Sequence, residues 1–141
     1  MSPRQKFFLQ IGCYLALLAA AIHMVGQISG PQSENPVEKQ LLDMMRTTKI
    51  ALPGASRTMM ELFDGLGLVF VTFLGTAAGI GFIVARRGAA DSMLANAIVR
   101  TLAVAFVVMT VVSITNFFLI PTACLAAVAV CFVAASFSSK T

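Results

Sequence analysis

From Thr101 to Ser139 the sequence contains no charged residue. The stretch is almost twice as long as the roughly 20 apolar residues that cross the hydrocarbon core of a bilayer. Its centre, around Asn116, Pro121 and Thr122, carries residues that interrupt a helix. Backbone polar groups cannot stay unpaired in lipid, so each half of the stretch must be helical. This feature predicts a hairpin of two transmembrane helices.

Two further apolar stretches, Phe7–Ile28 and Leu62–Val84, precede the hairpin. Hydrophobic residues make up 58% of the chain and charged residues 11%, whereas a soluble domain carries about 25% charged residues. The sequence therefore predicts an all-α integral membrane protein, a four-helix transmembrane bundle that forms a single domain over residues 1–141. The predicted spans cover about residues 7–28, 61–84, 95–117 and 121–138.

The distribution of Lys and Arg predicts the orientation, because cytoplasmic ends of spans are enriched in both residues. With the N-terminus inside, the inner face receives Arg4, Lys6, Arg86, Arg87, Arg100 and Lys140, and the outer face Lys39, Arg46, Lys49 and Arg57. We therefore expect both termini to be cytoplasmic, in a bacterial inner membrane. We also expect the first span to stay uncleaved, because its apolar run continues through Val25.

The connector at residues 29–58 is predicted to lie on the outer face. Asn35 and Pro36 have the pattern of a helix start, and a short amphipathic helix is expected from Pro36 to near Leu52. One side of this helix would be apolar and the rest charged, which favours a position on the bundle or in the headgroup plane. Thr58 and Glu61 form a capping-box pattern that begins the second span.

The second span contains a GxxxG motif at Gly75 and Gly79. Helices in lipid associate through close packing of small residues, so the stripe that carries this motif is expected to face inward. The stripe consists of Gly65, Leu68, Thr72, Gly75 and Gly79, and the opposite side, expected to face lipid, of Phe63, Phe70, Leu74 and Ala77. A homodimer seam is the alternative use of the same stripe.

Polar residues gather at the predicted outer ends of the spans. His23 comes late in the first span, and Glu61 and Asp64 come early in the antiparallel second span, so they are expected at similar depth. We predict that His23 hydrogen-bonds to Glu61, to Asp64 or to a water that they share. The candidate binding cluster consists of His23, Gln27, Arg57, Glu61, Asp64 and Asn116, with Thr122 on the same side. In the structural alternative both acids favour the helix start and Arg57 pairs with Glu61.

Sequence motifs that would indicate catalysis are absent. The chain has no HEXXH motif, no histidine series, no nucleophile elbow and no phosphate-binding glycine loop, so no metal or other cofactor is predicted. Cys13, Cys124 and Cys131 fall inside predicted spans and are expected to behave as small apolar residues. The net charge of +4 includes no long basic run, which argues against nucleic-acid binding.

The run from Arg57 to Gly65, Arg-Thr-Met-Met-Glu-Leu-Phe-Asp-Gly, resembles the start of the second helix in small uncharacterised bacterial four-span membrane proteins. That family pattern is Arg-Thr-x-x-acid-Leu-Phe-acid/amide-Gly, with a histidine late in the first span. The resemblance covers about the first 75 residues. It implies that His23, Arg57, Glu61 and Asp64 form a functional group, and it implies no particular activity or substrate.

These observations favour a non-enzymatic membrane protein, either an accessory subunit or a protein that binds a lipid or another hydrophobic ligand. Membrane lipid is the expected partner, together with a second copy of the chain or a larger membrane complex. One alternative is a small proton-coupled transporter, whose pathway would need a dimer built on Gly75 and Gly79. Another is a membrane-embedded isomerase that uses His23 with Glu61 or Asp64 in acid–base roles.

Overall fold

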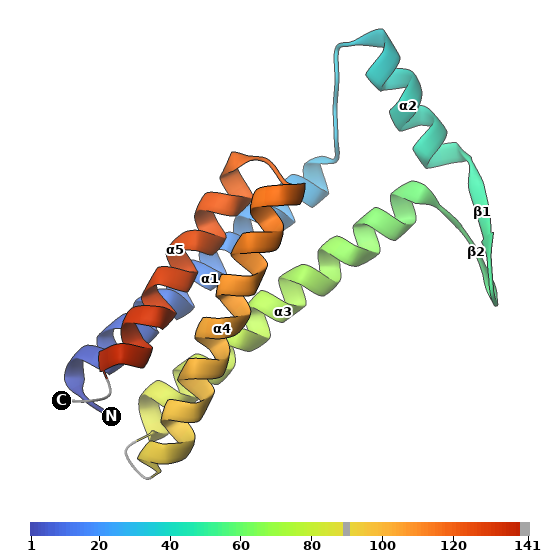
Figure 1. Cartoon of the computed structure of the whole chain (residues 1–141). Helices are drawn as coiled ribbons and strands as arrows, with labels where there is room; N and C mark the ends of the chain where they lie inside the picture. Colours follow the sequence, from blue (N-terminus) through green and yellow to red (C-terminus); the bar gives the residue numbers. More distant parts are fainter. Residues whose placement is uncertain (89–90, 139–141) are drawn as a thin grey trace. The chain divides into compact units, whose positions relative to one another are not determined.

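The computed structural model of the protein describes residues 1–88 and 91–138. Figure 1 shows the element order α1 (Pro3–Ser29), α2 (Pro36–Thr47), β1 (Lys49–Leu52), β2 (Ala55–Thr58), α3 (Met59–Arg87), α4 (Ser92–Asn116) and α5 (Leu119–Phe137). Helices α1, α3, α4 and α5 are each long and apolar enough to cross a membrane. The predicted all-α membrane fold with four spans and a short helix between the first two is confirmed.

The chain forms two compact units. Unit 1 consists of Met1–Ala20 and Phe73–Thr141, and unit 2 of Ala21–Thr72. Unit 1 therefore holds the first part of α1, the second part of α3, and helices α4 and α5. Unit 2 holds the end of α1, helix α2, the two strands and the start of α3.

The apolar core of unit 1 lies between its four helical segments. The Phe106 ring of α4 meets the Phe132 ring of α5 edge to face, with 5.1 Å between the ring centroids. Both rings are fully buried, as are Leu9 of α1 and Leu74 of α3. Burial of such rings and branched side chains is the main packing contribution available to a helix bundle.

Helix α3 buries a different face from the one predicted. Gly67, Leu74, Gly81 and Gly88 are buried and recur every seven residues, which is the period of a helix-packing seam. At Gly81 an added Cβ would collide with the Cys13 sulfur of α1. The GxxxG motif that predicted the inward face lies outside this seven-residue series.

The predicted inward stripe of α3 is consequently open. A Cβ built at Gly65, Gly75 or Gly79 would meet no other group within 4 Å in the described part of the chain, and Thr72 is also exposed. Of the residues expected to face lipid, Phe63 is exposed, but Leu74 is fully buried. Phe70 is half-buried and Ala77 is buried. Within the chain, the prediction that the glycine stripe faces inward was therefore wrong.

The connector contains a β-hairpin that the sequence analysis had read as helix. Helix α2 begins as predicted, with the Asn35 side chain accepting from the Val37 amide at 3.0 Å and Pro36 at its first position. It ends at Thr47 rather than near Leu52. The following residues pair antiparallel from Lys49↔Thr58 to Leu52↔Ala55, and the turn between them places Gly54 at φ 79°. β-branched residues before a Pro-Gly turn favour strands over another helical turn.

Candidate functional site

The predicted polar cluster divides between the two units. Asn116 belongs to unit 1, whereas His23, Gln27, Arg57, Glu61 and Asp64 belong to unit 2. Asn116 ends α4, where its amide nitrogen donates to the Val112 carbonyl at 2.9 Å and to the Thr115 hydroxyl at 2.7 Å. These are contacts within its own helix, so Asn116 has a local role at a helix end.

Glu61 is held by the start of α3. The Thr58 amide donates to the Glu61 carboxylate at 2.7 Å, and the Glu61 amide donates to the Thr58 hydroxyl at 3.1 Å. This reciprocal pair is the predicted capping box, and it satisfies two amides that the first helical turn leaves free. The Glu61 carboxylate is therefore already engaged in structure.

Arg57 does not pair with Glu61. It lies on strand β2, and its guanidinium donates to the Ser56 carbonyl at 3.4 Å. The ion pair found within residues 1–88 and 91–138 joins Arg46 to Asp43, at 3.9 Å. The predicted Arg57–Glu61 pair was wrong because four-residue spacing brings side chains together on a helix, and Arg57 is on an extended strand.

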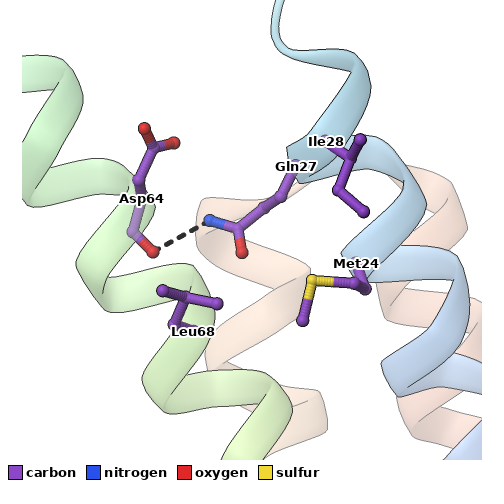
Figure 2. Close-up of a pocket in the computed structure, with 5 residues that line it drawn as sticks. All are labelled: Met24, Gln27, Ile28, Asp64 and Leu68. Atoms are coloured by element: carbon purple, nitrogen blue, oxygen red, sulfur yellow. Dashed lines mark hydrogen bonds between the residues drawn. The ribbon is translucent and has the colours of Figure 1, made fainter.

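Gln27 links α1 to α3. Its amide nitrogen donates to the Asp64 backbone carbonyl at 3.0 Å, as Figure 2 shows. The amide lies directly over Gly67, where any Cβ would collide with it. Gly67 therefore allows the close approach, and its only sequence signal is its place in the seven-residue series with Leu74, Gly81 and Gly88.

A cleft opens beside this hydrogen bond within unit 2. It is lined by Met24, Gln27, Ile28, Asp64 and Leu68 and has a volume of about 160 Å³. Figure 2 shows the Gln27 Oε1 atom facing the side chains of Met24 and Leu68, while the Asp64 carboxylate points away from the amide. Gln27 Oε1 is buried and has no hydrogen-bond partner.

His23 lies one helical turn before Gln27 on α1. Its ring stands edge-on to the Phe70 ring of α3, with 5.0 Å between the centroids, and its Nε2 atom is buried without a hydrogen-bond partner. Among the described residues no direct hydrogen bond joins it to Glu61 or Asp64. A shared water between these groups stays a prediction.

The orientation of α3 explains why the direct contact does not form. Glu61 lies six residues before the buried Gly67, which places it about 120° round the helix from the buried face. Phe70 lies nearer that face and meets His23 instead. The same rotation that exposes the GxxxG stripe thus moves Glu61 away from the imidazole, while Asp64 meets Gln27 through its backbone carbonyl.

Unit 1 contains a buried amide pair that the sequence analysis missed. Gln5 of α1 is 1% exposed, and its amide nitrogen donates to the Asn96 side-chain oxygen of α4 at 2.7 Å. The Gln5 Oε1 atom is buried without a partner. Gln5 stands between Arg4 and Lys6, before the predicted first span, so the apolar pattern gave no signal for the pair.

No three His, Cys, Asp or Glu side chains within the described ranges are grouped so that they could hold a metal ion. The three cysteines are free thiols, and Cys13 is buried. The chemistry that unit 2 offers is therefore hydrogen bonding beside an apolar cleft.

Comparison with known proteins gives no match for this chain to any family model, curated protein or solved structure. The resemblance of the Arg57–Gly65 run to small four-span proteins accordingly stays a prediction.

Proposed function

We propose that this integral membrane protein binds a lipid or another hydrophobic ligand in the cleft of unit 2. The observation that carries the proposal is an apolar cleft beside a buried amide oxygen, Gln27 Oε1, that has no partner. Small-molecule sites are commonly apolar, with a few polar atoms that orient the ligand.

Gln27 Oε1 is buried without a hydrogen-bond partner, and this is unfavourable. A buried polar group without a hydrogen bond costs about 1–3 kcal/mol. A ligand that donates to Gln27 Oε1 would remove this cost, while its apolar part covers Met24, Ile28 and Leu68. Ile28 is 79% exposed and Leu68 50% exposed, so apolar surface remains for such a ligand to cover.

The proposed setting is a bacterial inner membrane with both termini in the cytoplasm. It is supported by the distribution of Lys and Arg along the chain, with six on the inner side in this orientation and four on the outer side. Thiol labelling of Ser33→Cys and a reporter fused to the C-terminus check it. Labelling of residue 33 from the cytoplasm would show that the orientation is the opposite of the one proposed.

An accessory subunit is the second candidate function, and the open face of α3 favours it. Gly75 and Gly79 leave room for another transmembrane helix. Mild detergent extraction followed by mass measurement would detect a second copy or a partner chain. The enzyme alternative has less support, since among the described residues His23 hydrogen-bonds neither to Glu61, which is part of a cap, nor to Asp64.

Ligand binding can be measured at the Met24 methyl group. The chain is labelled with ¹³C at its methionine methyls, placed in lipid nanodiscs and titrated with 1-decanol. We expect a saturable shift of the Met24 signal, because Met24 lines the cleft. Met93 of α4, which is 82% exposed, serves as the internal control and should shift only in proportion to bulk partitioning.

Two substitutions on α3 give a matched comparison. Leu68→Phe fills the cleft and should abolish the saturable shift, whereas Leu66→Phe lies on an exposed position outside the cleft and should preserve it. If Met24 and Met93 shift alike and without saturation in the unsubstituted protein, the proposed site does not exist.

A further inference from the structure

Two buried polar atoms without partners lie on the same side of α1. They are His23 Nε2 and Gln27 Oε1, one helical turn apart. Four residues of α-helix rise by about 6 Å. Side chains four residues apart share one face of a helix, so one small polar group of a ligand can reach both.

We infer that the ligand carries a neutral hydroxyl group, which donates to Gln27 Oε1 and forms a second hydrogen bond with His23 Nε2. This inference rests on the proposed function and specifies the chemical class of its ligand. A hydroxyl both donates and accepts. It therefore satisfies the Gln27 oxygen with its one hydrogen, and its own oxygen accepts from His23 when Nε2 carries the hydrogen.

Anionic head groups do not fit these atoms. An ionised carboxylate or phosphate has no proton to donate to Gln27 Oε1. Asp64 also lines the cleft, and its carboxylate has no ion-pair partner among residues 1–88 and 91–138. This negative charge repels a negatively charged ligand head.

An ammonium head is disfavoured by geometry and by desolvation. Figure 2 shows the Asp64 carboxylate on the side of α3 that points away from the Gln27 amide. An ammonium group drawn to that carboxylate would leave Gln27 Oε1 unpaired. An ammonium group placed at Oε1 instead would be a charge buried beside Met24 and Leu68, which is costly without a counter-charge.

Met24 lies in the cleft beside the buried oxygen. In Figure 2 its side chain crosses the cleft below Gln27 Oε1, and that oxygen is inaccessible to water. Methionine has three rotatable side-chain bonds and repacks at little cost. Rotation of Met24 would let the hydroxyl take its place, while the ligand tail lies along Leu68 and Ile28. The expected class is an amphiphile with an uncharged hydroxyl head, such as a long-chain alcohol or a neutral lipid with a free hydroxyl.

The test compares two probes that differ in one proton. 1-Decanol can donate a hydrogen bond and decyl methyl ether cannot, and both are titrated into nanodiscs with the Met24 methyl signal as readout. We expect decanol to bind about fivefold to tenfold more tightly, which corresponds to one net hydrogen bond. In Gln27→Met the preference should disappear, whereas Gln40→Met, an exposed position on α2, should retain it.

A second variant tests the imidazole. His23→Phe keeps an aromatic ring against Phe70 and removes the Nε2 donor, so it should weaken decanol binding about threefold or more. The ether oxygen can also accept from Nε2, so ether binding should weaken to a similar degree and the preference for decanol should remain. Continued saturable binding of the ether shows that each variant is folded. If Gln27→Met does not fold, the comparison of the two probes in the unsubstituted protein and in His23→Phe still decides the question.

The outcomes separate the two proposals. Equal affinity for alcohol and ether would overturn the hydroxyl assignment and leave the proposed function standing. Tighter binding of decylamine than of decanol would also overturn it. Unchanged decanol binding in His23→Phe would remove the histidine from the site. Absence of saturable binding by every probe would overturn the proposed function together with this inference.

Discussion

The two units of this chain differ in how completely they bury and pair their side chains. Unit 1 contains fully buried rings and branched residues, such as Phe106, Phe132 and Leu74. Among residues 21–72 of unit 2, only Thr58 and Gly67 are buried. Unit 2 nevertheless holds His23 and Gln27, each with a buried polar atom that lacks a partner, whereas unit 1 holds one such atom among the described residues, Gln5 Oε1.

This contrast suggests that stability and ligand binding reside in different units. A packed apolar core holds its helices together but offers little recognition chemistry. A loosely buried region with unsatisfied polar atoms and an open cleft is less stable by itself, and it can gain hydrogen bonds from a ligand. We therefore assign the stability of the fold mainly to unit 1 and ligand binding to unit 2.

The largest expected effect is that of Leu74→Ala in unit 1. Leu74 is fully buried, so its truncation leaves a cavity and should lower the free energy of unfolding by about 2–4 kcal/mol. The matched change Leu66→Ala, at a position of unit 2 that is 69% exposed, should have little effect. Unfolding by SDS in mixed micelles, followed by circular dichroism, measures both. Equal losses at the two positions would contradict the difference between the units.

A smaller loss is expected for Gly12→Ala on α1. A Cβ there would lie 2.6 Å from the Phe132 ring, which is fully buried and cannot move freely, so overpacking should cost about 1–3 kcal/mol. Gly26→Ala on the same helix meets no group within 4 Å and should be neutral or stabilising, because alanine favours helix by about 1 kcal/mol. The same SDS titration compares them. Similar destabilisation by both changes would argue that the tight contact is absent.

The capping box should contribute about 1 kcal/mol. Thr58→Ala removes the hydroxyl that accepts from the Glu61 amide and should destabilise the start of α3 by that amount. Thr47→Ala at the end of α2 is the control, since its hydroxyl bonds only the Asp43 carbonyl of its own helix. Amide hydrogen exchange over residues 59–64 reports the change. Unaltered protection in Thr58→Ala would show that the cap does not hold this helix end.

The smallest stability effect and a clear binding effect are expected for Gly67→Ala. The added methyl collides with the Gln27 amide, which must move and lose its bond to Asp64. Decanol affinity should fall about fivefold, because the oriented oxygen is displaced. Gly65→Ala meets open space and should bind normally. If Gly67→Ala binds decanol normally, Gln27 does not take part in ligand binding.

Much of the fold could be predicted from the sequence. Span number, approximate bounds and the Asn35 and Thr58 helix starts follow from hydropathy and from local capping patterns, which act over a few residues. The inward face of α3 could not be predicted in the same way. Gly75 and Gly79 matched a known association motif, whereas the packing series through Gly67 and Gly81 depends on neighbours that only the folded chain supplies.

The candidate site was predicted in part. Gln27 and Asp64 were selected as polar residues near one end of their helices, and they meet through the Asp64 backbone rather than its carboxylate. The expected direct bond from His23 to an acid depended on the rotation of α3, and that rotation was assigned wrongly. The hairpin at Lys49–Thr58 was missed because helical periodicity in α2 was extended past Thr47.

The most direct test of the account is to map where an alcohol ligand contacts the chain. A long-chain alcohol with a diazirine in its tail is photolysed with the protein in nanodiscs, with and without excess decanol, and the labelled peptides are sequenced by mass spectrometry. We expect decanol-sensitive labelling at Met24, Ile28 and Leu68 of unit 2. Labelling confined to α4 and α5, or labelling that decanol does not compete, would contradict it.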